Sequence, residues 1–199
     1  MEPENNITLG GNHFSFRTFL KQLLSNVLSF GLAIVIVFLI HTFIGRPFLV
    51  NGESMDPNIK DRDFILVDTF TYHRREPVRG EVIVFRAPLP EKKFFIKRII
   101  GLPGETVEVL PTGKVVIYNT ENPKGFALDD SYILHDSTIA NTRTLPQDAY
   151  YVMGDNRANS LDSRMWGILP EENIIGRAYL RIYPFSSFDY LPAQVVYEQ

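Results

Sequence analysis

Cysteine is absent from the 199 residues of this chain. Its absence excludes disulfide bonds, a thiol nucleophile and metal sites built on thiolates. Basic residues are not in excess either, because 20 Lys and Arg stand against 23 Asp and Glu, which gives a net charge of -3. Binding to nucleic acid needs a basic excess or patch, so we do not expect that partner. The length allows one ordinary domain plus an appendage.

Histidine is also scarce, with His13, His41, His73 and His135 as the four copies. The first precedes a long apolar run and the second lies in it, so a Ser-His-Asp triad would have to use His73 or His135. Neither sits in a segment of unusual chemistry, and a surface position is the simpler interpretation of each. No two histidines have the spacing of zinc ligands, so we expect no metal site.

Charged side chains are missing from Val27 to Gly45, VLSFGLAIVIVFLIHTFIG, a run of 19 residues. A helix of this length spans roughly 28 Å, close to the hydrocarbon thickness of a bilayer. A cleaved secretory signal usually has a shorter apolar region, and no small-x-small site follows Gly45. A buried core helix would normally show a polar face. We therefore expect a tail and helix start at 1–26, a transmembrane anchor at 27–45 and a folded domain at 46–199.

From Arg46 onward, short β-rich runs are broken by Gly, Pro and Asp, which is typical of an all-β domain. Thr112 and Gly113 predict a hairpin turn. The segment from Thr120 to Gln147 is polar with little periodicity, so we expect a long surface connection there. The candidate strands are Asp63–Phe70, Glu81–Arg86, Phe94–Ile100, Thr106–Leu110, Lys114–Asn119, Tyr150–Met153 and Ile175–Tyr183.

Lys97 is unusual because, in FFIKRII, a strand places it on the same face as Phe95 and Ile99. Burial disfavours the charged ammonium and lowers the lysine pKa, so that a neutral amine can act as a general base near physiological pH. The alternative is an edge strand from which Lys97 and Arg98 extend into solvent. This segment alone leaves both interpretations open.

Two further segments favour the buried base. NGESMDP, from Asn51 to Pro57, places Ser54 shortly after a turn-forming Gly52 and just beyond the apolar run. GDNRANSLDSRMWG, from Gly154 to Gly167, gathers carboxylate, amide, hydroxyl and guanidinium groups. A calcium loop is one interpretation, but the stretch lacks the glycine at position 6 and the glutamate at position 12 of an EF-hand. A self-satisfied polar loop that braces a site fits better.

With these segments in hand, the chain closely resembles the bacterial type I signal peptidases of peptidase family S26, membrane-bound serine-lysine proteases that remove signal peptides from exported proteins. The matching pieces are GESMDP, DRDFILVDTF, RGEVIVF, FIKRIIGLPGE and YYVMGDNRANSLDSRMWG, in the family's order between Phe48 and Gly167. The single anchor and short length look like the compact form found in Gram-positive bacteria. The resemblance implies a mainly β, barrel-like catalytic domain behind one N-terminal transmembrane helix.

Carried over residue by residue, the resemblance also implies the roles of individual side chains. Ser54 matches the nucleophile and Lys97 the general base, which makes the chain a serine hydrolase. Ser160 matches the serine that hydrogen-bonds to the lysine and orients it. Four residues match positions that brace the site, with an ion pair expected between the second and third: Asp155, Asp162, Arg164 and Arg98.

The sequence departs from the family at Gly52, where some members have a serine whose hydroxyl helps to form the oxyanion hole. Here the hole is expected to rely on backbone amides at Ser54 and Gly52, chiefly that of Ser54. Asn58 and Ile59 replace the commoner Thr-Leu, and Ala158 replaces an Asp; both changes look like tolerated variants. The residues that match the lining of shallow pockets for small side chains are Phe48, Val50, Met55, Ile59 and Ile96.

The function implied by the resemblance is removal of N-terminal signal peptides through an acyl-enzyme, without a metal or organic cofactor. The implied partners are signal peptides of exported preproteins, membrane lipid and the secretion machinery. The implied location is the cell membrane, in a single pass, with the N-terminus cytoplasmic and the catalytic domain extracytoplasmic. The charges favour this orientation only slightly, because Arg17 and Lys21 precede the apolar run and Arg46 follows it.

Two rival functions remain open at this point. A self-cleaving repressor-type protease would share the fold, but the apolar anchor and the GDNR stretch argue against it. A non-enzymatic factor in pilus or surface-protein assembly should have lost Ser54 or Lys97, and this chain retains both.

Overall fold

A computed structural model describes residues 16–43, 45–91, 93–133 and 139–197. The chain divides into two compact units, Met1–Thr42 and Phe43–Gln199. His135 lies outside the described residues, so its predicted surface position stays a prediction.

The first unit contains all but the last residue of helix α1, Phe16–Phe43, which has 28 residues. Within it, Phe19–Val37 is long and apolar enough to cross a membrane, and none of that stretch is buried against other described residues. The helix begins before the predicted anchor and ends before Gly45, whose φ of 118° lies outside helical geometry. The described residues therefore contain one helix of membrane-spanning length, and its apolar stretch begins and ends closer to the N-terminus than the predicted anchor.

The second unit is mainly β, as predicted, and the described strand pairs are all antiparallel. The larger sheet has the order β1-β2-β11-β3-β4-β9-β10, with β12 on β11, and the smaller sheet has the order β7-β6-β5-β8. No described pairing joins β1 to β10, so the barrel-like sheet stays open between these ends. The strands are β1 (Arg46–Leu49), β2 (Phe64–Asp68), β3 (Val82–Arg86), β4 (Phe94–Gly101), β5 (Thr106–Val109), β6 (Val115–Tyr118), β7 (Phe126–Ala127), β8 (Asn141–Thr144), β9 (Ala149–Met153), β10 (Leu169–Pro170), β11 (Ile174–Tyr183) and β12 (Asp189–Tyr190).

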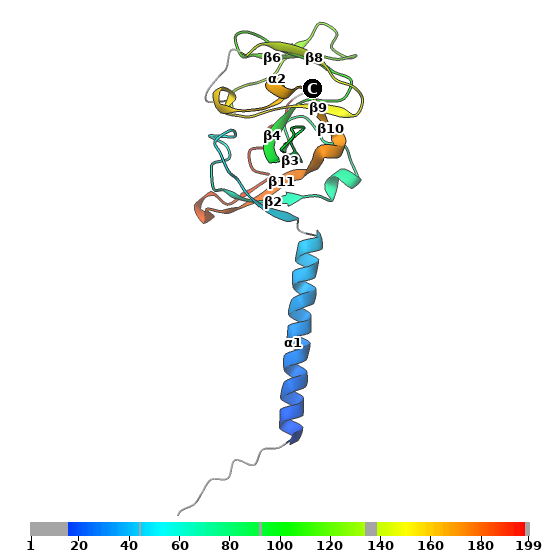
Figure 1. The fold of residues 1–199 in the computed structure, drawn as a ribbon, viewed down its shortest axis with the longest axis vertical. Coiled ribbons are helices and arrows are strands. Elements are labelled where there is room, and N and C mark those ends of the chain that lie inside the picture. Colours follow the sequence, from blue (N-terminus) through cyan, green and yellow to red (C-terminus); the bar gives the residue numbers. More distant parts are fainter. Residues whose placement is uncertain (1–15, 44, 92, 134–138, 198–199) are drawn as a thin grey trace, which may run out of the picture. The chain divides into compact units, whose positions relative to one another are not determined.

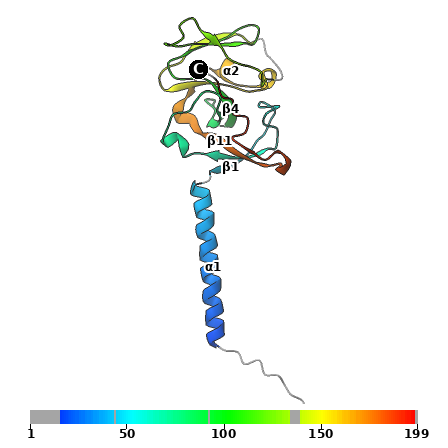
Figure 2. The same cartoon turned by 180° about the vertical axis from the view of Figure 1, so that it is seen from behind.

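Short helical turns connect some of the strands. Helix α2 spans Ser163–Trp166, and the 3-10 turns are η1 (Thr71–His73), η2 (Arg157–Asn159), η3 (Glu171–Asn173) and η4 (Phe185–Ser187). In both views of the fold, the strands of the smaller sheet lie at the opposite end of this unit from β1 and β2 (Figures 1 and 2).

All seven predicted strands are confirmed, as β2 to β6, β9 and β11, and β5 pairs with β6 around the predicted hairpin turn. The prediction of an irregular connection from Thr120 to Gln147 is partly wrong, because β7 and β8 lie in it. Strand β7 has two residues and β8 reads NTRT, so neither carries the apolar alternation that marks a strand.

Strand β3 is buried on both faces, and successive residues point into different cores. Val82 and Val84 belong to a cluster with Met55 and Ile59, beneath the NGESMDP turn. Ile83 belongs to a second cluster, formed with residues of β4, β9 and β10. The sheet is thus covered on both sides along residues 82–85 of β3 and 97–101 of β4, so side chains in these stretches have little access to water.

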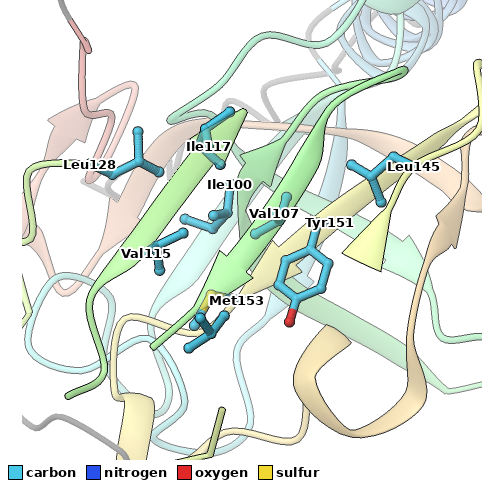
Figure 3. Close-up of a cluster of buried hydrophobic side chains, with 9 residues drawn as sticks. Ile100, Val107, Val115, Ile117, Leu128, Leu145, Tyr151 and Met153 are labelled. Atoms are coloured by element: carbon cyan, nitrogen blue, oxygen red, sulfur yellow. The ribbon is translucent and has the colours of Figure 1, made fainter. Parts of the chain in front are cut away.

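A third cluster joins the two sheets. Figure 3 shows side chains from β5 and β6, among them Val107 and Ile117, gathered with Ile100 of β4 and with Tyr151 and Met153 of β9. Gly101 helps this contact, because a Cβ there would lie 2.3 Å from a methyl group of Val107. The smaller sheet is therefore fixed to β4, the strand that carries Lys97.

The contribution to stability of the cluster that contains Ile83 can be tested by substitution of Phe85, another of its members. Its side chain is fully buried and its ring lies 6.0 Å from that of Trp166. Phe85→Ala should lower the free energy of unfolding by about 3–5 kcal/mol, because it removes buried apolar area and leaves a cavity. The measurement is denaturant unfolding of the full chain in detergent micelles, followed by circular dichroism. Phe185→Ala is the matched control, since Phe185 is 82% exposed and should change stability little; equal losses for the two variants would contradict this account of the core.

Candidate active site

The predicted nucleophile lies in a tight loop between β1 and β2. Val50 and Arg62 close the loop by backbone hydrogen bonds, with Val50 N–H donating to Asp63 O at 2.9 Å and Arg62 N–H donating to Val50 O at 2.8 Å. Met55 and Ile59 are fully buried beneath it. Burial of these two apolar side chains fixes the turn and leaves Ser54, which directly precedes Met55, half-buried at the surface.

Lys97 lies on β4, which pairs with β3 on one side and with β9 on the other. Its side chain is 4% exposed. The Nζ atom lies 2.6 Å from Ser54 Oγ and donates to the carbonyl oxygen of Ile96 at 2.8 Å. The alternative of an edge strand with a solvated lysine is therefore wrong, and the prediction of a buried lysine is confirmed.

Burial sets the protonation of Lys97. Removal of the ammonium from water lowers the pKa of Lys97 from 10.5 to about 8. The carboxylates of Asp162 and Asp155 oppose this shift, and the guanidinium of Arg164 adds to it. The Phe95 ring also lies 5.3 Å from Nζ. Near neutral pH an appreciable fraction of the amine is thus neutral and able to accept the Ser54 proton.

Asp155 ties three segments together. Arg98, the neighbour of Lys97, donates to it twice, from Nε at 2.8 Å and from Nη2 at 2.5 Å. Asn58 of the Ser54 loop donates its amide to the same carboxylate at 2.8 Å. Arg98 and Asp155 are each about 1% exposed, so the pair is dry and its donors and acceptors are largely satisfied by each other.

Asp162 and Arg164 form the predicted ion pair, with Nε to Oδ1 and Nη2 to Oδ2 both at 2.8 Å. Asp162 Oδ2 also accepts the Gly154 N–H at 3.0 Å, and Arg164 donates to the carbonyl of Arg157 at 2.8 Å. The predicted polar loop therefore satisfies most of its groups internally, which holds it rigid.

The Gly154 segment is pressed directly against the nucleophile. Asn156 N–H donates to the Ser54 carbonyl at 3.0 Å. A Cβ on Gly154 would lie 2.4 Å from that carbonyl oxygen and 2.3 Å from Ser160 Oγ. Only glycine permits this approach, so any side chain at 154 would push the loop away from Ser54.

Ser160 does not make the hydrogen bond expected for it. Its Oγ atom is buried and has no hydrogen-bond partner among the described residues, while the bonds of Lys97 go to Ser54 and Ile96. Ser160 nevertheless contacts the Gly154 segment behind the nucleophile. Sequence matching placed it in the right region, but the hydroxyl orientation depends on three-dimensional packing that the motif does not contain.

The predicted oxyanion donors differ from each other in the structure. Gly52 N–H donates to Asp61 Oδ1 at 2.8 Å, so this amide is already used. Ser54 N–H has no hydrogen-bond partner among the described residues. The role predicted for Gly52 would require its amide to leave Asp61, whereas the Ser54 amide is available to a developing oxyanion.

A cleft of about 740 Å³ opens beside the Ser54–Lys97 pair. Of the predicted pocket residues, Phe48, Val50 and Ile96 line it. Met55 and Ile59 do not, because both are fully buried in the core under the loop. Three apolar lining residues that were not predicted, Leu49, Phe94 and Phe95, lie next to or two positions from predicted ones in the sequence. Three others are brought to the cleft only by the fold: Ile65, Val84 and Leu161.

Other kinds of site find less support in the described part of the chain. His73 lies in η1 with its ring 6.1 Å from that of Phe70, and it does not line the cleft. No cluster of three or more histidine or carboxylate side chains in the described ranges is placed to hold a metal ion.

Known proteins provide an independent comparison. The family model described as signal peptidase, peptidase S26, matches residues 23–183. Signal peptidase I of Leptolyngbya laminosa is 38% identical over 172 residues, which cover 82% of this chain and 81% of that protein. Signal peptidase IB of Staphylococcus aureus strain MRSA252 is 35% identical over 182 residues, which cover 85% of this chain and 94% of that protein.

A solved structure also matches. Signal peptidase I from Enterococcus faecalis V583 is 29% identical with a TM-score of 0.42, over 52% of this chain and 97% of that one. The family model and the two sequence relatives each extend over most of the chain. The residues matched by the family model include the Ser54 loop, β4 and the Gly154 segment. On that match, the chain belongs to the signal peptidase family, peptidase S26.

Proposed function

We infer that this protein is a membrane-anchored serine endopeptidase that removes N-terminal signal peptides from exported preproteins with Ser54 and Lys97 as its catalytic pair. Family membership supports the reaction class. The observation that carries the assignment of residues is the distance of 2.6 Å between Lys97 Nζ and Ser54 Oγ at the edge of the cleft. This is the separation that proton transfer between a hydroxyl and its base requires.

Acylation starts with neutral Lys97. Its lone pair accepts the Ser54 proton as Oγ attacks the scissile carbonyl, and the Ser54 N–H is placed to donate to the oxyanion of the tetrahedral intermediate. When the C–N bond breaks, the Lys97 ammonium gives its proton to the leaving amine. The mature protein leaves, and the signal peptide remains as an ester on Ser54.

Deacylation uses the same base a second time. A water molecule gives its proton to Lys97 as its oxygen attacks the ester carbonyl, and Lys97 then protonates Ser54 Oγ as the ester breaks. No histidine is required, since a desolvated amine with a pKa of about 8 is a sufficient base near neutral pH.

The cleft suits a peptide segment with small side chains before the cut. Phe48, Val50 and Ile96 give it apolar walls. β1 pairs with β2 on one side and with no described strand on the other, so its free edge offers backbone hydrogen bonds to an extended peptide. Small residues at the first and third positions before the cut would let such a peptide lie close to Ser54.

Membrane anchoring follows from the family and fits the single apolar helix. For orientation, we propose a cytoplasmic N-terminus and an extracytoplasmic catalytic unit, supported by Arg17 and Lys21 before the apolar stretch. Confinement to the membrane raises the effective concentration of preproteins that are themselves held there. Contacts with lipid and with the secretion machinery are part of the same proposal.

The rival functions are less favoured. A non-enzymatic assembly factor has no need for a nucleophile and base in hydrogen-bond contact, and both are retained here. A self-cleaving repressor does not account for the apolar helix or for the family match that extends from residue 23 to residue 183.

Removal of either reactive group should abolish cleavage. Ser54→Ala and Lys97→Met should each lower kcat by about three orders of magnitude or more, because the pair acts as a unit. Methionine keeps an unbranched side chain of similar length in the buried site, so folding should be retained. The measurement is cleavage of a purified preprotein in detergent. Ser186→Ala and Lys114→Met are matched controls at exposed positions; cleavage by the active-site variants at the control rate would refute the dyad.

The pH profile should report Lys97 as the base. Only the neutral amine accepts a proton, so kcat/KM should be highest above the Lys97 pKa of about 8 and fall about tenfold per pH unit well below it. Initial rates on a fluorogenic signal-peptide substrate between about pH 6 and about pH 10 give this limb. A rate that does not decline between about pH 8 and about pH 6 would be incompatible with a lysine base.

Orientation can be tested by protease protection on intact cells. An epitope following residue 197 should be digested from outside, whereas an epitope before residue 16 should be protected until the cells are lysed. The opposite pattern, with the C-terminal epitope protected, would overturn the proposed topology while leaving the chemistry untouched.

A further inference from the structure

Tyr132 lies in the connection between β7 and β8, a segment without an assigned role, yet it contacts the supports of both reactive groups. Its carbonyl oxygen accepts a hydrogen bond from Asn58 Nδ2 at 3.1 Å. The same amide nitrogen donates to Asp155, and Asn58 belongs to the turn that carries Ser54. The backbone of Tyr132 is thus joined to the nucleophile's loop.

The ring of Tyr132 covers the neighbour of Lys97. The Arg98 guanidinium carbon lies 4.4 Å from the ring centroid, a cation-π contact with a fully buried cation. Arg157 of the polar loop donates to the Tyr132 hydroxyl at 3.2 Å. One half-buried side chain therefore contacts β4 and the loop that presses against Ser54.

The C-terminal segment, Leu191–Tyr197, completes this arrangement. Tyr132 and Tyr197 share a hydrogen bond between their hydroxyl groups, at 2.8 Å. The Tyr197 ring packs on the cluster that joins the two sheets, and burial raises its pKa, so the phenol stays protonated. Arg98 also donates to the carbonyl oxygens of Gly80 and Ala193.

Gly80 shows how closely this C-terminal segment is seated. A Cβ on Gly80 would lie 1.9 Å from the Val195 carbonyl oxygen, and φ at Gly80 is +88°. Only glycine fits there, so the backbone at Gly80 accommodates the tail directly beside Arg98. A C-terminal segment that did not pack against residue 80 would not require glycine there.

We propose that Tyr132 and Tyr197, here called the tyrosine clamp, are positioning residues. They keep the Ser54 hydroxyl within hydrogen-bond distance of the Lys97 amine. They act through their contacts with the network of Asn58, Arg98 and Asp155. The clamp touches no substrate and no reacting atom. It acts by fastening two segments, 43 positions apart in sequence, whose side chains must meet at hydrogen-bond distance. The inference rests on the proposed function of that pair.

A loosened clamp should change the basicity of Lys97. The groups that act on this amine are the Ser54 hydroxyl, the Phe95 ring, the Asp155 and Asp162 carboxylates and the Arg164 guanidinium. Entry of water would relieve the desolvation that lowers the Lys97 pKa, and a less tightly paired Asp155 would attract the ammonium more strongly. Both changes raise the Lys97 pKa, so more of the base is protonated at neutral pH.

The test uses the full chain in detergent with Tyr132→Phe, Tyr197→Phe and the double variant. Phenylalanine keeps the rings, and therefore the packing on Arg98 and on the core, and removes only the hydroxyl hydrogen bonds. Tyr118→Phe is the matched control, because its hydroxyl donates to Glu108 at 2.6 Å in the smaller sheet, away from the cleft. Cleavage is measured as kcat and KM across the pH range, with the thermal unfolding midpoint of each variant.

Each single variant should lower kcat near pH 7 by about three- to tenfold, with KM unchanged, because both lose the shared hydrogen bond. Tyr132→Phe should be the worse of the two, since it also loses the hydrogen bond from Arg157. The acid limb of kcat should move to higher pH, so that the loss shrinks at alkaline pH. The double variant should be no worse than the worse single one, because the two hydroxyls share one bond. Tyr118→Phe should match the parent in both kcat and acid limb.

Other results would overturn the clamp. One is parental kcat in both single variants; another is a loss of equal size at every pH with an unmoved acid limb, which a merely structural effect would give. Additive losses in the double variant would also contradict the shared bond. Failure of the proposed function looks different, since the parent and Tyr118→Phe would then fail to cleave the preprotein as well.

Discussion

The desolvation of one amine is the constraint on which the rest of this structure depends. An exposed lysine is charged at neutral pH and has no lone pair to accept a proton. In the proposed mechanism, Lys97 can act as a base because β4 runs between β3 and β9, with apolar clusters covering both faces of the sheet. The two-sided burial of β3 and β4 is thus a requirement of the chemistry as well as a source of stability.

The charged groups around Lys97 follow from the same constraint. Two carboxylates near the amine favour its charged form and would, if left unpaired, cancel part of the effect of burial. Asp155 is paired with Arg98, and Asp162 with Arg164, each with two charge-assisted hydrogen bonds. Pairing brings a compensating positive charge beside each carboxylate, so the loop can be polar and rigid without making the amine strongly basic. A loop of unpaired carboxylates at the same place would work against the base.

Most of the strands and the apolar helix could be predicted from local patterns of apolar and charged residues. Alternation of apolar residues located seven strands and placed Lys97 on the face of Phe95 and Ile99, and a run without charges located the apolar helix. The match of ordered motifs then paired Ser54 with Lys97, which lie 43 positions apart and which no local pattern could join. Predictions that depended on side-chain direction fared worse. Met55 and Ile59 look like pocket residues by position, yet burial under the loop is the more favourable place for two apolar side chains.

The same reasoning explains why the remaining features escaped prediction. Gly52 N–H donates to Asp61, and Ser160 Oγ has no partner in the described part of the chain; both facts follow from the packing of loops rather than from residue type. Strands β7 and β8 are too short or too polar to show a period, and Tyr132 lies between them in a segment that reads as a plain connection.

A base made by desolvation is sensitive to any opening that admits water, because a small gain in hydration restores the charge. A histidine base, with an ordinary pKa near 6.5, would not need such protection. A lysine base therefore requires that segments far from it in sequence seal its surroundings. The C-terminal segment seated on Gly80, and the connection that carries Tyr132, lie where that seal is needed, beside Arg98 and behind the Ser54 loop. Under the proposed mechanism, catalysis by this chain therefore depends on completion of the whole β unit, including parts that no catalytic motif contains.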